Sequence, residues 1–480
     1  MMHALASGGV VLFLGFGWAV AQGQLAGFVN HGLVGVGRIP ADSYDQLGTQ
    51  VDTLGGIGSA VFLDASSVTL TGDTTNGFTY SGTLYAMPDR GYGDGTQDYH
   101  PRIQVFRLTL TPYYGRGPVG QTQIAMSNVA TIVLTFRGHP FTGSDPNDPR
   151  VTRHPQSARA GPGRGRWSLD PEGLVRTRDG DFFVSDEYGP FIYRFDPKGA
   201  LRRTVQPPDA FLPKRGVYAG VNAFSGTNTL ASGRVRNRGL EGLTLTPDGK
   251  RLVAMMQGPL TQDGGTNTAS RNARILVFKL GKSSRQGAKL VGEYVYPLTL
   301  NGSPARDTQT TVSDILAVDD NRFFVLERDS FGLGATTNSS PLYKSINLVS
   351  LVGASNLAHT GYDLERGAPG QRSLPTSTLP SDVQPVQRQE FVSLLDPAQL
   401  ARFGLNLSTN QDANTLAEKW EGLALMPLRD PAAPGDCFLL VASDNDFRAH
   451  RVYHNGRCVG TNAVAVDSLL LAFRVTLPLN

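Results

Sequence analysis

One pattern recurs along this chain of 480 residues and limits its possible folds more than any other feature. Its clearest copy runs from Trp167 to Gly199, WSLDPEGLVRTRDGDFFVSDEYGPFIYRFDPKG, and reads as three short strands joined by tight turns. The turn at 178–180 joins the first two strands into a hairpin. Glu172 and Glu187 therefore lie at the same edge, opposite that turn. Carboxylates gathered at one edge repel each other unless a cation, a proton or an arginine lies between them.

Similar units recur before and after this copy. They span residues 57–110, 238–280, 313–351 and 419–447. Antiparallel repeats of about 40 to 50 residues are typical of β-propeller blades. We therefore predict an all-β fold, a β-propeller of five to six four-stranded blades with long loop inserts. In such a ring, equivalent strand ends gather around the mouth of a central channel, so the acidic residues of several blades are expected to converge.

The two ends of the predicted domain each supply a strand-like segment. We expect residues 28–40 to form an outer strand that pairs with residues 468–477 of the last blade, because this pairing closes the ring and removes exposed edges. Residues 396–405 (DPAQLARFGL) predict a short helix with Asp396 as its N-cap.

The first 21 residues resemble a secretory signal peptide. They contain a short apolar run, Val10 to Val20, and the cleavage signature Ala19-Val20-Ala21. A buried N-terminal strand is the alternative, and the run is too short and glycine-rich for a good membrane span. We predict export, with residues 22–480 forming one secreted propeller domain that is a monomer and has no membrane partner.

Charge and cysteine content narrow the partners further. A net charge of +3 favours neither nucleic acid nor membranes, and the basic stretch 150–166 lacks interleaved aromatic residues, so we expect no nucleic-acid binding. The only two cysteines, Cys437 and Cys458, fall in the last blade, where export favours a disulfide and two free thiols are the alternative.

Three sequons follow the pattern for N-glycosylation in an exported chain. They lie at Asn301, Asn338 and Asn406 and predict a glycoprotein.

Several motifs together resemble one known family. They are the Glu-Gly-Leu strand openings at Glu172, Glu241 and Glu421, VSDE at 184–187, NRGLEGLTLTPDGK at 237–250, and ASDND at 442–446. In combination they are similar to the phytase-like propeller family, also described as having esterase-like activity of phytase. The similarity covers about residues 55–473. It implies a secreted or periplasmic protein that hydrolyses phosphate or other esters, and it assigns no catalytic residues.

The repeats themselves predict a metal site. Seven carboxylates are expected at the channel mouth as metal ligands: Glu172, Glu187, Glu241, Glu421, Asp89, Asp314 and Asp444. Hard oxygen ligands without a cysteine or histidine cluster suit Ca²⁺ or Mg²⁺, and we predict Ca²⁺ because its coordination is flexible. Such an ion would hold and polarise an ester or phosphate oxygen. The alternative for each glutamate is that it caps backbone amides and stiffens its blade.

Four residues are candidates for catalysis: Glu187, Glu327, Arg90 and Arg328. Each arginine closely follows an acidic strand end, where it would bind a substrate anion or form a salt bridge with neighbouring carboxylates. The sequence thus predicts a metal-dependent hydrolase acting on a small-molecule ester or phosphoester. The alternative is a non-catalytic, calcium-stabilised propeller that binds a carbohydrate or protein. Phytate is very anionic, and the mouth supplies only a few arginines, so a less charged ester competes with phytate as the expected substrate.

Overall fold

The computed structural model describes residues 25–47, 51–73, 75, 77–146, 166–216, 221–224, 230–265, 270–281, 287–300, 310–376 and 378–478. The predicted signal peptide, most of the 137–166 loop and the sequon at Asn301 lie outside these residues. The domain start near residue 22 stays a prediction for the same reason. Within the described part, no helix is long and apolar enough to cross a membrane.

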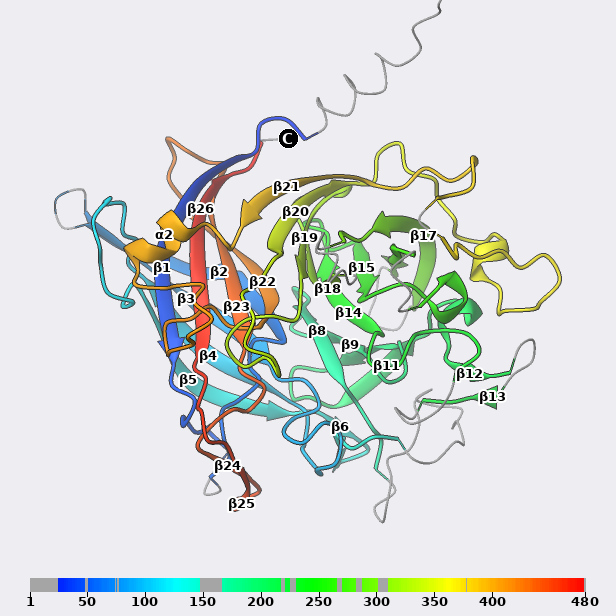
Figure 1. The fold of residues 1–480 in the computed structure, drawn as a ribbon, viewed down its shortest axis with the longest axis horizontal. Coiled ribbons are helices and arrows are strands. Elements are labelled where there is room, and N and C mark those ends of the chain that lie inside the picture. Colours follow the sequence, from blue (N-terminus) through cyan, green and yellow to red (C-terminus); the bar gives the residue numbers. More distant parts are fainter. Residues whose placement is uncertain are drawn as a thin grey trace, which may run out of the picture.

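Five four-stranded antiparallel sheets form a ring around a central channel, which confirms the propeller and fixes the number of described blades at five (Figure 1). Blade 1 contains β2 (Ala60–Asp73), β3 (Gly77–Met87), β4 (Arg102–Leu110) and β5 (Ile124–Val133). Blade 2 contains β8 (Pro171–Arg176), β9 (Phe182–Asp186), β10 (Ile192–Phe195) and β11 (Leu201–Val205). Blade 3 contains β14 (Leu240–Leu245), β15 (Arg251–Met256), β16 (Asn272–Leu280) and β17 (Ala288–Pro297). Blade 4 contains β18 (Thr311–Ala317), β19 (Arg322–Arg328), β20 (Lys344–Ser350) and β21 (Gln387–Ser393).

Blade 5 closes the ring with strands from both ends of the chain. It contains β22 (Lys419–Pro427), β23 (Asp436–Asp444), β26 (Ser468–Thr476) and, as its outermost strand, β1 (Val29–Ile39). The register runs from Val29 opposite Thr476 to Ile39 opposite Ser468, which confirms the predicted pairing. Figure 1 shows blue β1 lying beside red β26.

The apolar core is divided among the seams between neighbouring blades. Leu84 of blade 1 and Leu440 of blade 5, for example, belong to one buried cluster, and Val175 of blade 2 and Leu252 of blade 3 belong to another. Each blade therefore buries both of its faces against its neighbours, and the inner strands are held rigidly around the channel.

Several short elements lie in the loops that connect the strands of the ring. They are β6 (Thr135–Phe136), β7 (His139–Pro140), β12 (Lys214–Arg215), β13 (Val221–Asn222), β24 (Arg451–His454), β25 (Arg457–Thr461), the 3-10 helices η1 (Asp209–Phe211), η2 (Thr261–Asp263) and η3 (Gly361–Asp363), and the α-helix α2 (Pro397–Arg402). The cap of α2 is the predicted one, because Asp396 accepts hydrogen bonds from the backbone N–H groups of Ala398 and Gln399.

The predicted disulfide is wrong for this structure. Cys437 and Cys458 are both free. Cys437 lies near the start of β23, whereas Cys458 lies in β25, beyond the far end of that strand. A nine-residue strand spans about 30 Å, so the chain holds the two thiols apart.

Candidate functional site

Each inner strand from blade 2 to blade 5 carries a β-bulge where it enters the channel mouth. The pairing register shifts between Pro171 and Gly173, and equivalent shifts flank Glu241, Ser313 and Glu421. A bulge adds one residue to a strand and re-aims its side chain. The bulged residues are therefore Glu172, Glu241, Ser313 and Glu421, and all four are buried.

The glycine that follows each glutamate lets neighbouring inner strands approach closely. A Cβ atom on Gly242 would lie 2.5 Å from the backbone nitrogen of Ile315, and one on Gly173 would lie 2.6 Å from Cβ of Leu243. Such distances exclude any side chain without movement of the backbone. The Glu-Gly-Leu motif thus joins a carboxylate at the mouth to a strand contact that only glycine permits.

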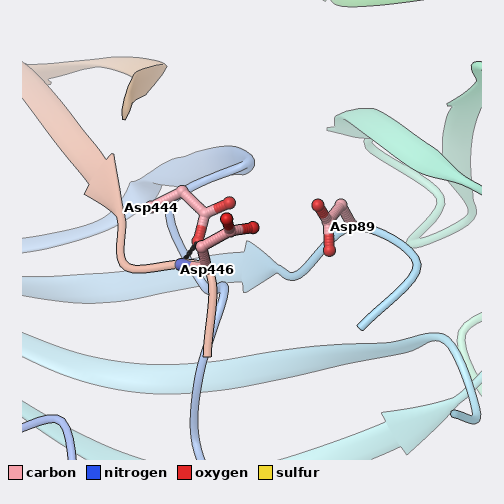
Figure 2. A group of neighbouring side chains, drawn as sticks. All are labelled: Asp89, Asp444 and Asp446. Carbon is pink, nitrogen blue, oxygen red and sulfur yellow. Dashed lines mark hydrogen bonds between the residues drawn. The ribbon is translucent and has the colours of Figure 1, made fainter. Parts of the chain in front are cut away.

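Two groups of carboxylates form at the mouth, and each has the size of a cation site. In the first, Asp170, Glu172 and Glu187 each place an oxygen atom within 4.8 Å of the others, and all three residues are buried. In the second, Asp89, Asp444 and Asp446 do the same, with Asp446 exposed (Figure 2). We call these the Asp170 group and the Asp89 group.

The Asp170 group is only partly neutralised. Nη1 of Arg90 lies 3.0 Å from Oδ2 of Asp170, and the backbone N–H of Gly239 donates to Oε1 of Glu187 at 3.4 Å. Among the residues that the structure describes, no arginine or backbone N–H supports Glu172 in this way. Burial, followed by repulsion from Glu241 and other carboxylates, raises its pKa well above the usual value. This repulsion is the kind that a bound cation relieves.

Glu241 adds a further acceptor beside the Asp170 group. The residue is 2% exposed, and its Oε2 has no hydrogen-bond partner among the described residues. Burial, then Glu187 and Glu421, raises its pKa well above the usual value. A buried oxygen without a partner is costly, so the donor set of Asp170, Glu172, Glu187 and Glu241 fits a hard divalent cation.

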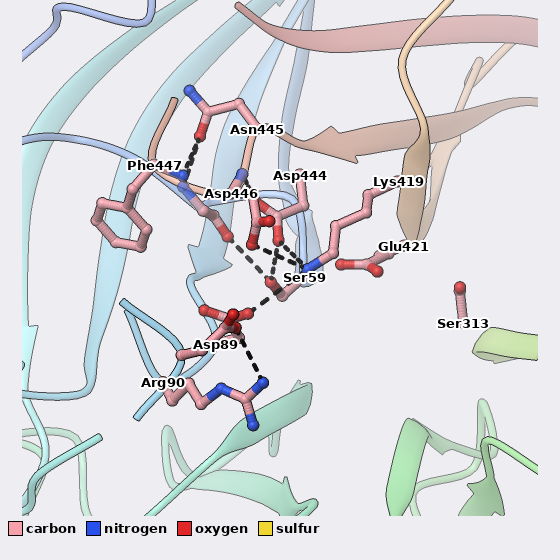
Figure 3. A network of polar contacts seen from close by, with 12 residues as sticks. Ser59, Asp89, Arg90, Ser313, Lys419, Glu421, Asp444, Asn445, Asp446 and Phe447 are labelled. Carbon is pink, nitrogen blue, oxygen red and sulfur yellow. Dashed lines mark hydrogen bonds and ion pairs between the residues drawn. The ribbon is translucent and has the colours of Figure 1, made fainter. Parts of the chain in front are cut away.

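The Asp89 group surrounds a lysine instead. Nζ of Lys419 lies 3.1 Å from Asp446, 3.3 Å from Asp444 and 3.7 Å from Asp89 (Figure 3). Ser59 also donates to Oδ2 of Asp444 at 3.2 Å. The chain itself therefore supplies a cation to this group, which offsets part of its negative charge.

Both candidate arginines form salt bridges at the mouth. Arg90 binds Asp170 and also donates to Asp94 at 3.1 Å. Arg328 pairs with Oε1 of Glu421 and donates to Ser313 at 3.1 Å. Of the two alternatives for these arginines, the structure thus shows the pairing with carboxylates.

Two predicted site residues have carboxylates that are bound away from both groups. Oε2 of Glu327 accepts hydrogen bonds from Tyr296 at 2.7 Å, Asn347 at 3.2 Å and Arg388 at 2.9 Å, all on outer strands, so its carboxylate is withdrawn from the mouth. Asp314 is one position beyond the bulge at Ser313, and its carboxylate accepts the backbone N–H of Leu423 at 2.8 Å.

Three residues of the site were not predicted. Asp170 and Lys419 each lie two positions before the glutamate of a Glu-Gly-Leu motif, and this spacing could have found them. Asp446 ends the ASDND motif, but its relation to Lys419 is visible only in the folded ring.

A cavity of about 1150 Å³ lies at the opposite end of the channel. Val175, Leu243 and Ile315 line it together with the strand turns at 178–179 and 246–249. None of the mouth carboxylates contributes to its wall. The cavity wall therefore lacks both carboxylate groups that could hold a metal ion, and the acidic mouth is the better candidate for chemistry.

The chain is similar to several known proteins. A curated protein of Arthroderma benhamiae, described as an uncharacterized secreted protein, is 32% identical over 458 residues, which cover 87% of each chain. Among solved structures, the chain also matches a luciferin-regenerating enzyme with 9% sequence identity and a TM-score of 0.27, over 92% of this chain and 95% of that one. It matches the Malassezia sympodialis allergen Mala s 1 with 11% identity and a TM-score of 0.30, over 91% of this chain and 95% of that one. Both scores are too low to bear on function. The family model described as phytase-like, esterase-like activity of phytase, matches residues 74–447. The chain therefore belongs to the phytase-like family.

Proposed function

We propose that this protein is a secreted hydrolase of small-molecule esters that uses one divalent cation, Ca²⁺, bound by Asp170, Glu172 and Glu241. The secreted relative and the family match support export and ester chemistry. The main observation in support of a metal ion is the buried Oε2 of Glu241, which lacks a hydrogen-bond partner among the described residues and lies next to the mutually repelling carboxylates of the Asp170 group.

In this proposal the residues at the mouth have three different roles. Asp170, Glu172 and Glu241 hold the cation, which would polarise the ester carbonyl and lower the pKa of a bound water. Arg90 keeps Asp170 oriented through its 3.0 Å ion pair. Glu187, whose carboxylate lies within 4.8 Å of Asp170 and Glu172, takes the proton of the attacking water and returns it to the alkoxide that leaves when the acyl C–O bond breaks.

The charge of the mouth favours a weakly charged substrate. Eight carboxylates gather there: Asp89, Asp170, Glu172, Glu187, Glu241, Glu421, Asp444 and Asp446. Arg90, Arg328 and Lys419 pair with them, and Arg234 and Arg238 add positive charge near Glu187. Arg448 adds positive charge near Asp446, so one divalent cation brings these charges close to balance and leaves no excess of positive charge for a highly anionic substrate. A carboxylic ester or lactone therefore fits better than phytate.

Replacing Glu172 and Glu241 together by Gln tests the proposal. We expect the wild-type protein to bind calcium and to hydrolyse p-nitrophenyl butyrate or a lactone faster than p-nitrophenyl phosphate, with activity lost in EDTA. The double variant should lose tight calcium binding and activity while keeping its circular dichroism spectrum. Glu390→Gln, an exposed change on β21, is the matched control and should retain both.

The possible results separate the alternatives. Calcium binding without turnover on any ester would support the non-catalytic propeller. Faster hydrolysis of phytate than of neutral esters would contradict the argument from charge. An unchanged calcium content in the double variant would refute the shared site.

A further inference from the structure

The Asp89 group has the composition of a metal site and is occupied by a side chain. Lys419, the first residue of β22, extends its ammonium among Asp89, Asp444 and Asp446 at 3.1 to 3.7 Å (Figure 3). Without the lysine, three carboxylate oxygens within 4.8 Å of one another would surround a space that a divalent cation suits.

A second observation points to a cation at the same place. Glu421 is 3% exposed, and its Oε2 has no hydrogen-bond partner in the described part of the chain. Figure 3 shows the carboxylate of Glu421 turned toward the ammonium of Lys419. Three carboxylates thus surround one position, with the carboxylate of Glu421 turned toward it, and the chain fills that position itself.

The repeat explains why the two groups at the mouth differ. Asp170 precedes Glu172 by two residues in blade 2, and Lys419 precedes Glu421 by two residues in blade 5. At corresponding positions of the repeat, one blade therefore supplies an anion and the other a cation. Blade 2 has a carboxylate at this position and needs an external cation, whereas blade 5 has the ammonium of Lys419 there.

We infer that Lys419 is a tethered cation that fills a latent second divalent-cation site, so that the mouth holds one metal ion and not two. This inference concerns the site of the proposed function and refines its substrate class. Two ions a few ångströms apart clamp the attacking and leaving oxygens of a phosphoryl group. A mouth with one ion and a lysine saturated by carboxylates lacks that clamp, which favours carboxylic esters or lactones over phosphate esters.

Counting bound calcium in the Lys419→Met variant tests the inference. Methionine keeps an unbranched stem and removes the charge. We expect one tightly bound Ca²⁺ per wild-type chain and two per Lys419→Met chain, measured by equilibrium dialysis with elemental analysis. Adding Asp446→Asn to Lys419→Met should return the count to one. Lys250→Met, which removes an exposed lysine paired with Asp248, is the control and should leave it at one.

A second variant keeps the test decisive if Lys419→Met does not fold. Asp446→Asn alone should leave the wild-type count unchanged, because Asp446 binds Lys419 and not a metal. Three results would each overturn the inference. They are a loss of calcium from Asp446→Asn, two ions bound by the wild type, and one ion bound by folded Lys419→Met, the same number as by the wild type. No ion in the wild type and one in Lys419→Met would support the latent site filled by Lys419 and contradict the metal site of the proposed function.

Discussion

Oδ2 of Asp314, on the inner strand of blade 4, accepts a 2.8 Å hydrogen bond from the backbone N–H of Leu423, on the inner strand of blade 5. Oδ1 accepts the N–H of Ile315 at 2.8 Å, and the carboxyl also binds the backbone of Leu243 in blade 3. One buried side chain therefore ties three inner strands together around the channel.

Replacing Asp314 should destabilise the fold without affecting the metal. Asp314→Ala leaves these backbone donors without their acceptor, which we expect to lower the free energy of unfolding by about 2 to 4 kcal/mol. Asp314→Asn keeps one acceptor oxygen and should lose less. Urea unfolding measures the change, and calcium content should stay at the wild-type value. Loss of calcium with unchanged stability would instead make Asp314 the ligand that the repeat predicted.

The close contact between inner strands predicts that alanine substitutions at two glycines have very different effects on the free energy of unfolding. Gly242→Ala would place Cβ 2.5 Å from the nitrogen of Ile315, and overpacking of this kind costs about 1 to 3 kcal/mol. Gly120→Ala is the matched control, because its Cβ would meet nothing within 4 Å. We expect that variant to unfold within about 0.5 kcal/mol of the wild type. Equal midpoints in thermal or urea unfolding would contradict the close strand contact.

The repeat was sufficient to predict the propeller, its closure by β1 and β26, and the convergence of Glu172, Glu187 and Glu241. These features follow from periodicity and from strand ends, which are local in sequence. The register of one strand was not predictable, because the bulge in β18 falls on Ser313 and moves Asp314 into the contact between strands.

Side-chain partners were the other limit. Glu327 follows the same rule as Glu187 at the level of sequence, but Arg388 and Asn347 draw it toward the outer strands. Lys419 reaches Asp89 across the seam between blades 5 and 1, at a sequence separation that no local pattern records. Such contacts depend on the exact geometry of ring closure. The sequence pattern predicts that the ring closes but not this geometry.

The two thiols should differ strongly in reactivity. Cys458 is exposed, whereas burial, followed by the charge of Asp436, raises the pKa of Cys437 to about 11. Thiolate is the reactive form. We therefore expect one fast equivalent with a disulfide reagent on the native, unreduced protein and a second only after denaturation. No reactive thiol in the denatured, unreduced protein would restore the disulfide predicted from export.

Acid should weaken the fold through His454. Its ring is buried against Tyr99 and Phe447, at centroid distances of 4.8 and 5.7 Å, and within the described residues neither ring nitrogen has a hydrogen-bond partner. Burial, followed by the charge of Arg102, lowers its pKa to about 4. The unfolded chain binds a proton near pH 6.5. Between pH 6.5 and 4 the unfolded state is therefore the more protonated one, and its stabilisation lowers the free energy of unfolding as the pH falls.

His454→Phe keeps an aromatic ring in that space and removes the titration. The depressed pKa corresponds to about 3 kcal/mol between pH 7 and pH 4, with no effect of this group above pH 7. Urea unfolding of both proteins at pH 7, 5.5 and 4.5 should therefore show the variant gaining stability relative to the wild type at each step down. The comparison cancels contributions from the many carboxylates and from His100, which both proteins share. A constant difference at all three pH values would mean that folding does not lower the pKa of His454.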